Sequence, residues 1–257
     1  MDKWYEVPGK AGTNVIYSRV RLVRNLKEYP FPGRLTKEQS AELSEKLLGG
    51  LTGIASMDRM QYRFTHLERM GDLEKTALLE RRAINRSVMK KKDPTGMILS
   101  EDESTAILLN GDDHVRIQTL QTGLTLEQLY ERADKIDNYI SERFDYAFDE
   151  KYGYLTSFPT NVGTGLRAAV VLHLPMLSKN KNFNSLVADM GRFGTQVRGV
   201  YGEGAENFGS LYQISNQKTL GQTEREIIDI VRKAALELDV QERRVRREYR
   251  QRKPGQA

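Results

Sequence analysis

Four stretches of the chain carry apolar residues at the spacing of a helix that buries one side. Three of them follow a Thr that has Gln or Glu three residues later, which is the capping-box pattern of a helix start. These predicted helices begin after Thr36, Thr125 and Thr223, and the second is expected to continue to Phe144. The fourth spans residues 72–85. The apolar stripes of the second and last helices are Leu129, Ala133, Ile136 and Ile140, and Ile227, Val231, Ala235 and Leu238.

Shorter apolar runs and two-residue alternation predict strands between these helices. The runs at 97–100 and 105–109 flank a polar turn, which indicates a hairpin. After the turn dipeptide Asn110-Gly111, alternation over 112–119 predicts a strand with one polar face. That face would carry Asp112, His114, Arg116 and Gln118.

Three further segments are expected to be strands. Residues 14–25 open with β-branched and aromatic residues, and an extended chain there would place Arg19 and Arg21 on one face. Residues 168–172 predict a buried strand and residues 211–215 another. Because several predicted strands follow one another without an intervening helix, the pattern favours an α+β fold with an antiparallel sheet.

Composition excludes several classes of protein. The 257 residues include no cysteine, which excludes disulfides, thiolate metal sites and cysteine nucleophiles. The three histidines lie far apart in the sequence, so we predict no metal-binding residues. No segment approaches the roughly 20 apolar residues of a membrane span, and no secretory signal is recognisable. We therefore expect a cytoplasmic protein without membrane contact.

The positive charge is concentrated in one segment. The formal net charge is +5, and residues 241–253, with seven Arg or Lys and two Glu, account for all of it. The rest of the chain is neutral, which argues against a nucleic-acid-binding module, because such modules usually carry their excess on a folded face. The basic tail, residues 241–257, is either a solvated helix end or a segment that docks on a partner or binds phosphate.

Five arginines occur beside strand signals or glycine-rich loops: Arg19, Arg21, Arg116, Arg167 and Arg198. Converging guanidiniums bind phosphate through charge-assisted, bidentate hydrogen bonds, and the neighbouring glycines would let backbone N–H groups approach a nucleotide. Neither a Walker P-loop nor a G-x-G-x-x-G fingerprint is present. Asp112 and Glu203 are candidate carboxylates in the same segments. Each of these residues taken singly also fits an ordinary surface, turn or cap position, so both interpretations stay open.

Four segments resemble, in sequence and in order, the phosphagen (ATP:guanido) kinase family: SRVRLVRNLKEYPFP, NGDDHVRIQ, GYLTSFPTNVGTGLRA and RGVYGEGAENFGSLYQISNQ. Within that family they are most similar to the bacterial protein-arginine kinases, and the resemblance covers residues 14–240. It implies one catalytic-type domain over residues 1–257, an α+β fold in which helices flank a large antiparallel sheet of the glutamine synthetase type. It also implies a phosphotransferase that moves the γ-phosphoryl group of ATP to arginine residues of proteins.

The resemblance assigns roles to particular residues. It implies two substrate carboxylates, Asp112, which would orient and deprotonate the guanidinium, and Glu203. The implied ATP-binding residues are Ser18, Arg19, Val20, Arg21, Arg116, Arg167, Ala168, Ala169, Val170, Val171, Arg198, Gly199, Val200, Tyr201, Gly202 and Glu203. ATP is expected with Mg²⁺ bound to the nucleotide, and proteins bearing arginine are the expected substrates. A homodimer and a stress-response activator or protease system are further partners that the family suggests.

Three residues depart from the family pattern, all on the guanidine side. Phe158 stands where the family has a reactive Cys, and Gly111 and Asp112 replace two consecutive Glu. Since Asp is one methylene shorter than Glu, its carboxylate would fall about 1 Å short, and a misplacement of that size costs roughly 10²-fold in rate. Two hypotheses follow: an active protein-arginine kinase, or a weakened or inactive relative that binds ATP and acts as a regulatory partner.

Overall fold

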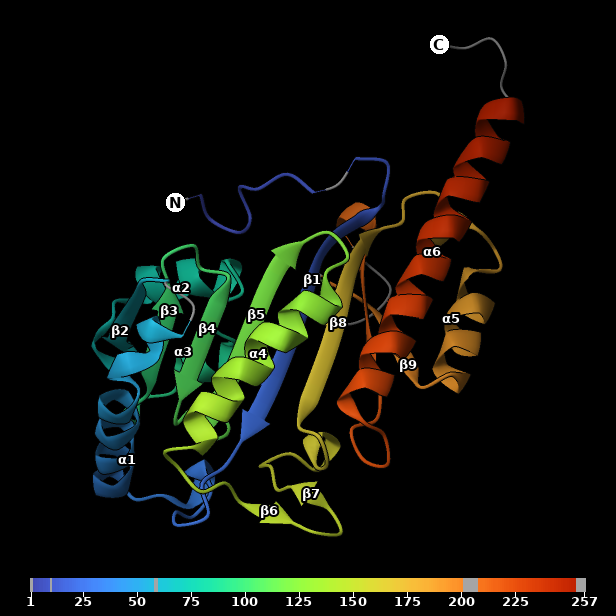
Figure 1. Cartoon of the computed structure of the whole chain (residues 1–257). Helices are drawn as coiled ribbons and strands as arrows, with labels where there is room; N and C mark the ends of the chain where they lie inside the picture. Colours follow the sequence, from blue (N-terminus) through green and yellow to red (C-terminus); the bar gives the residue numbers. More distant parts are fainter. Residues whose placement is uncertain (1, 10, 58–59, 201–207, 253–257) are drawn as a thin grey trace.

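The computed structural model describes residues 2–9, 11–57, 60–200 and 208–252. The described residues form an eight-stranded antiparallel sheet in the order β2-β3-β4-β5-β1-β8-β10-β9 (Figure 1). The strands are β1 Val15–Arg24, β2 Tyr62–His66, β3 Gly96–Ser100, β4 Thr105–Leu109, β5 Val115–Thr122, β8 Leu166–His173, β9 Thr195–Gly199 and β10 Leu211–Asn216. A separate hairpin consists of β6 Phe148–Asp149 and β7 Gly153–Tyr154. The predicted α+β class with a large antiparallel sheet is confirmed.

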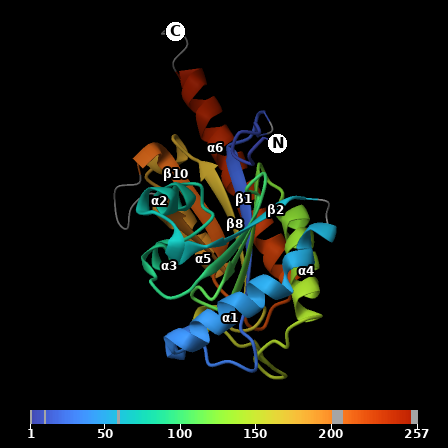
Figure 2. The same ribbon diagram turned by 90° about the vertical axis from the view of Figure 1, so that its left-hand side faces the viewer.

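The helices are distributed unequally over the two faces of the sheet. They are α1 Lys37–Gly50, α2 Asp72–Glu80, α3 Arg86–Lys90, α4 Leu126–Ser141, α5 Phe183–Arg192 and α6 Glu224–Arg252. The long helices α1, α4 and α6 cover one face, whereas the short α2 and α3 lie against the other (Figures 1 and 2). The sequence pattern does not predict β2, β9 or α5.

The main hydrophobic core lies between the sheet and the long helices. Its members include Val20, Leu22, Ile117, Ala168 and Val170 from the strands, and Leu43, Leu129, Ile136 and Val231 from the helices. A smaller cluster lies beneath α2 and α3, where Leu78 and Val88 join Met97 and Leu108 of the sheet. Because side chains alternate along a strand, burying Val20 under the helices turns Arg19 and Arg21 to the opposite face. That face carries the site described below.

The segment predicted as one helix over residues 72–85 is two helices joined by a turn. After α2 ends, Arg82 adopts a left-handed backbone with φ of 67°. Asn85 then caps α3, because its side chain accepts a hydrogen bond from the Val88 N–H. The turn also places Ile84 in the small core, where it is 3% exposed. Burial of this side chain, which a straight helix would aim elsewhere, accounts for the break.

Two of the three predicted capping boxes are confirmed. Thr36 exchanges hydrogen bonds with Gln39, and Thr223 does so with Glu226. The box predicted at Thr125 is wrong, since its Oγ1 has no partner among the described residues and its N–H donates to the Ser18 hydroxyl instead. A contact with β1 has replaced the local cap there. The stripes predicted for α4 and α6 are buried as expected.

The C-terminal helix ties the start of the basic segment to the body of the protein. Glu242 is fully buried and accepts hydrogen bonds from the backbone N–H groups of Met176 and Leu177. Arg246 donates to Glu242 and to Asn14 at the start of β1. Beyond this contact α6 extends past the edge of the sheet (Figure 1). No helix of the part of the chain described is long and apolar enough to cross a membrane.

Candidate active site

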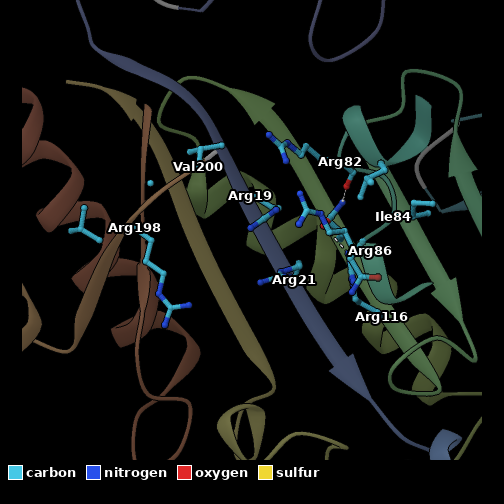
Figure 3. Close-up of a pocket in the computed structure, with 13 residues that line it drawn as sticks. Arg19, Arg21, Arg82, Ile84, Arg86, Arg116, Arg198 and Val200 are labelled. Carbon is cyan, nitrogen blue, oxygen red and sulfur yellow. Dashed lines mark hydrogen bonds between the residues drawn. The ribbon is translucent and has the colours of Figure 1, made fainter. Parts of the chain in front are cut away.

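The five predicted phosphate-binding arginines come from four strands and share the face opposite the long helices. They are Arg19 and Arg21 from β1, Arg116 from β5, Arg167 from β8 and Arg198 from β9. In the strand register Arg21 lies between Gln118 on β5 and Arg167 on β8. Figure 3 shows Arg19, Arg21 and Arg116 close together, with Arg198 across the cavity from them. The sheet therefore gathers residues that are up to 179 positions apart in the sequence.

A cavity of about 800 Å³ opens between these strands and the α2–α3 segment. Its volume is within the usual range for sites that bind a small molecule or cofactor. It is lined by Arg19, Arg21, Leu79, Arg82, Ile84, Asn85, Arg86, Arg116, Gln118, Val197, Arg198, Gly199 and Val200. Six of these residues are arginines, so the ligand that fits this cavity is an anion.

The arginines at the centre of the cavity have few partners. Arg19 donates one hydrogen bond, to Gln213 Oε1 at 2.9 Å, and Arg116 donates one to Gln118 Oε1 at 3.3 Å. Arg21 makes no hydrogen bond or ion pair with any described residue, and the Nε–H groups of all three are buried without an acceptor among those residues. A native protein rarely leaves buried donors unmatched. These guanidiniums are therefore available to a ligand.

Burial and mutual repulsion lower the pKa of each of these guanidinium groups. The pKa of Arg21 is held well below its ordinary value by burial first, and then by Arg19, Arg116 and Arg167. Burial likewise lowers the pKa of Arg116 to about 10. Arginine side chains keep their proton in proteins, so the cavity holds an excess of positive charge. An anion placed there removes that repulsion, which favours binding.

Arg167 differs from the other arginines, because neutral oxygens already hold its guanidinium. It donates to Asn161 Oδ1 at 3.0 Å, to the Asn216 carbonyl at 2.7 Å and to the Thr160 carbonyl at 2.9 Å. Burial, and then the charge of Arg198, lower its pKa. These bonds orient the side chain without neutralising it. Arg167 therefore adds positive charge to the site from a position fixed by the protein.

Asp112 lies in the turn before β5 and not on a strand, which corrects the prediction for residues 112–119. The strand begins at Val115, so only Arg116 and Gln118 of the predicted polar face share it. His114 is fully buried, where its Nδ1 accepts from the Leu26 N–H and its Nε2 lies 3.0 Å from the Pro30 carbonyl. Burial lowers the His114 pKa to about 4, so its role is structural.

The Asp112 carboxylate lies at the edge of the cavity. Its Oδ2 accepts a hydrogen bond from Asn85 Nδ2 at 2.7 Å, and Asn85 is itself a lining residue. Its negative charge raises the pKa of both Arg21 and Arg116, against the larger effect of burial. The site thus combines a strongly positive cavity with one carboxylate on its border. That combination suits a reaction in which a phosphoryl group meets a cationic acceptor.

Comparison with known proteins gives the family. Residues 45–245 match the model of the ATP:guanido phosphotransferase C-terminal catalytic domain. The chain belongs to the ATP:guanido phosphotransferase family. It is 40% identical over 234 residues to a protein-arginine kinase of Caldanaerobacter subterraneus subsp. tengcongensis, covering 91% of this chain and 69% of that relative. A protein-arginine kinase of Desulforamulus reducens is 40% identical over 251 residues, with 96% of this chain and 69% of the relative covered.

Solved structures share the fold of this guanido phosphotransferase. The duplicated taurocyamine kinase from Schistosoma mansoni with bound transition-state-analogue components matches with a TM-score of 0.81 and 27% identity, over 94% of this chain and 34% of that one. A lombricine kinase matches with a TM-score of 0.80 and 24% identity, over 91% of this chain and 67% of that one. The predicted family and its fold are confirmed.

The residues that depart from the family pattern lie on two segments of this guanido phosphotransferase that are joined by a hydrogen bond. Asp113 is buried and accepts hydrogen bonds from the Ser157 N–H and from Asn25 Nδ2, both at 2.7 Å. This contact fastens the segment of Phe158 to the turn that carries Asp112. The Phe158 side chain is 51% exposed, so it is not part of the core. It stands at the surface, directly after the residue that bonds to the turn of Asp112.

The other predicted ATP-binding residues have different positions. The side chains of Val20, Ala168 and Val170 face the main core, and the Ser18 hydroxyl donates to the Gly123 carbonyl, so none of these lines the cavity. Ala169 and Val171 alternate onto the arginine face, whereas Gly199 and Val200 line the cavity itself. Tyr201, Gly202 and Glu203 lie outside the described residues. Their predicted roles, including the second carboxylate at Glu203, stay predictions.

Sequence reasoning missed four polar residues of the cavity wall, namely Arg82, Asn85, Arg86 and Gln118. Arg82 and Arg86 come from the α2–α3 segment, where the continuous helical pattern gives no sign of a turn (Figure 3). Gln118 joins the segment to the sheet, since its Nε2 donates to the Arg82 carbonyl at 2.5 Å while its Oε1 accepts from Arg116. Of these residues, the sequence indicated only Gln118, as a member of the predicted polar strand face.

Proposed function

We propose that this chain transfers the γ-phosphoryl group of ATP to the guanidinium of arginine residues in proteins. The observation that supports this most strongly is the set of partly buried, unneutralised arginines whose cavity has the Asp112 carboxylate at its edge. The polyphosphate of ATP supplies the missing negative charge, and charge-assisted hydrogen bonds from guanidinium groups are the strong kind. Membership of the guanido phosphotransferase family and the protein-arginine kinase relatives point to the same chemistry.

The proposed reaction assigns a task to each side of the cavity. A guanidinium nitrogen of the substrate attacks the γ-phosphorus, an N–P bond forms, and the bond from that phosphorus to the bridging oxygen breaks to release ADP. The attacking nitrogen gives up its proton to Asp112, because a protonated guanidinium is a poor nucleophile. The arginines stabilise the charge that spreads over the transferring group. Glu203 is proposed as a second carboxylate for the substrate guanidinium.

Mg²⁺ is proposed to enter with the nucleotide. No three His, Asp or Glu side chains within the described ranges are grouped so as to hold a metal ion. A site of this kind fits a cation bound mainly by phosphate oxygens and water, which is the usual mode for Mg²⁺ in nucleotide sites. When bound, the ion would neutralise part of the phosphate charge, and the arginines would neutralise the remaining charge and hold the phosphates in place.

Other features remain predictions, since no contact of the described residues tests them. These are the single catalytic-type domain over residues 1–257, the cytoplasmic location, the homodimer and a stress-response activator or protease partner. The proposed substrates are proteins bearing arginine, as the names of the relatives suggest.

Incubation of the purified chain with Mg-ATP and an arginine-rich protein tests the proposal directly. We expect acid-labile phosphoarginine, detected by mass spectrometry under mild conditions. Asp112→Asn keeps the shape of the side chain but removes the proton acceptor, and general-base catalysis is typically worth about 10²- to 10⁴-fold. Turnover should fall by that factor while ADP affinity stays within about two-fold. ATP binding without any phosphoarginine would instead support the inactive regulatory relative.

A further inference from the structure

The short helix α3 is fastened to the turn that carries Asp112. The ammonium group of Lys91 donates to the carbonyl oxygens of Asn110 and Gly111 at 2.6 and 2.9 Å. Val88 packs closely on Gly111. A Cβ atom added at Gly111 would lie 3.2 Å from Cγ2 of Val88. The helix and the turn are therefore held together as one unit.

Both carboxylate oxygens of Asp112 are engaged by this helix. Asn85 Nδ2 donates to Oδ2 at 2.7 Å, and the Ser87 hydroxyl donates to Oδ1 at 2.6 Å. One donor on each oxygen fixes the rotation of the carboxylate plane. An ionised carboxylate has about four acceptor positions, so lone pairs on both oxygens remain for a further donor. The carboxylate is thus oriented without being saturated.

The orientation of the Asn85 amide is itself fixed by the helix. Its Oδ1 accepts from the Val88 N–H at 3.0 Å, whereas the single proton of the Ser87 hydroxyl goes to the closer Asp112 Oδ1. An amide oxygen held by this backbone donor leaves Nδ2 facing the acceptor oxygen of Asp112, which assigns the amide orientation. The cap of α3 and the orientation of the carboxylate depend on one side chain.

We propose that Asn85 and Ser87 are positioning residues that aim the Asp112 carboxylate at the substrate guanidinium, an inference that rests on the proposed function. Asn85 lines the arginine cavity, so the oriented carboxylate lies on the border between the phosphate-binding arginines and solvent. The side chain of Asp112 is one methylene shorter than the Glu of the family pattern. Two fixed hydrogen bonds give this shorter side chain a single direction, and orientation of a catalytic group is a large part of catalysis.

Two variants separate positioning from folding. Ser87→Ala removes one donor from an exposed side chain. Asn85→Asp keeps the oxygen that caps α3 but replaces the donor to Asp112 with a repelling carboxylate. We expect kcat for phosphoarginine formation to fall about 10-fold in Ser87→Ala and about 10²-fold in Asn85→Asp, the scale of a 1 Å misplacement. The melting temperature of both variants should stay close to that of the wild type. ADP affinity, measured by calorimetry, should stay unchanged in Ser87→Ala and should fall in Asn85→Asp, which adds a negative charge to the cavity wall.

Matched controls come from sites far from the cavity. Ser141→Ala removes an exposed hydroxyl that, within the described part of the chain, donates just to the Asn138 carbonyl of α4. Asn180→Asp keeps an exposed side-chain oxygen that accepts from the Asn182 N–H. Both controls should retain wild-type kcat. In the Asp112→Asn background Ser87→Ala should have no further effect on kcat, because groups that act through one another are not additive.

A second readout keeps the inference separate from the proposed function. Calorimetry with an arginine-containing peptide, Mg-ADP and nitrate measures guanidinium binding without turnover. If the wild type binds the peptide but forms no phosphoarginine, and Ser87→Ala weakens that binding, the positioning role stands and the kinase proposal fails. Turnover or peptide affinity that is equal in wild type, Ser87→Ala and Asn85→Asp overturns the positioning role alone. Absence of both binding and turnover in the wild type refutes both proposals.

Discussion

Arg21 forms no ion pair with a described residue, and burial first, then Arg19, Arg116 and Arg167, lower its pKa. Ordinary folding would not favour such a group, because it is partly buried and repelled by its neighbours without a compensating bond. Arg21 therefore lowers the stability of the free protein and raises its affinity for an anion, as is common for residues of binding sites.

Replacing Arg21 by Gln should separate stability from binding. We expect ADP affinity to fall about 10- to 100-fold, since a hydrogen bond to a charged group contributes roughly 1.5–3 kcal/mol. The free protein should be at least as stable as the wild type, because the change relieves repulsion. Calorimetry and urea unfolding measure the two quantities. Arg34→Gln, at an exposed arginine outside the cavity, serves as the control, and a large loss of stability in Arg21→Gln would contradict this account.

At the scale of elements, the last helix is held by buried carboxylates that the apolar stripe alone would not reveal. Asp239 accepts from the N–H and the side-chain amide of Asn14, and Glu242 accepts from two backbone N–H groups near Met176. These bonds hold α6 against the beginning of β1 and the segment after β8. The start of the basic segment, around Glu242 in α6, is therefore part of the folded body.

Glu242→Ala should weaken this docking substantially. It leaves buried backbone donors without an acceptor and removes the partner of Arg246, so we expect a loss of about 2–4 kcal/mol in the free energy of unfolding. Glu248→Ala is the matched control on the same helix, because Glu248 is exposed and, among the described residues, pairs with Arg244 alone. An exposed pair of this kind contributes less than about 1 kcal/mol. Equal losses in urea unfolding of the two variants would argue against the docking role.

At the scale of the whole molecule, His114 joins separate parts of the fold. It contacts the chain after β1 through Leu26, the following segment through Pro30, and it directly precedes β5. The hydrogen bonds of the neutral ring are complete, and a second proton would break the bond that Nδ1 accepts. Stability should therefore depend on keeping this side chain neutral.

This predicts a specific loss of stability in acid. The folded-state pKa of His114 is lowered to about 4 from 6.5, so its contribution is fully present above pH 6.5 and is lost as the pH falls toward 4. The difference corresponds to about 3 kcal/mol between pH 7 and pH 4. Urea unfolding across this range measures it, and His114→Gln should lack this part of the pH dependence. A wild type and variant with parallel profiles would refute the assignment.

The local periodicity of the chain determined much of this structure before any tertiary contact was considered. Alternation in residues 14–25 placed Arg19 and Arg21 on one face, and the helical stripe predicted the buried side of α4. These signals work because near neighbours along a strand or helix share a face whatever surrounds them. The family motifs added the identity of the arginines, since each motif is a short continuous segment.

Only the tertiary structure decided which of these faces meet. Strand order brings Arg198 into the cavity of Arg19 and Arg21, and burial of Ile84 breaks the predicted helix so that Arg82 and Arg86 reach the same cavity. Asp112 precedes the strand that was predicted to contain it, and its carboxylate accepts hydrogen bonds from Asn85 and Ser87 of the α3 segment. Such outcomes depend on long-range packing and on where each buried polar group finds its partner. Neighbouring residues alone do not encode these contacts, so the sequence predicted the chemistry of the site and the fold supplied its geometry.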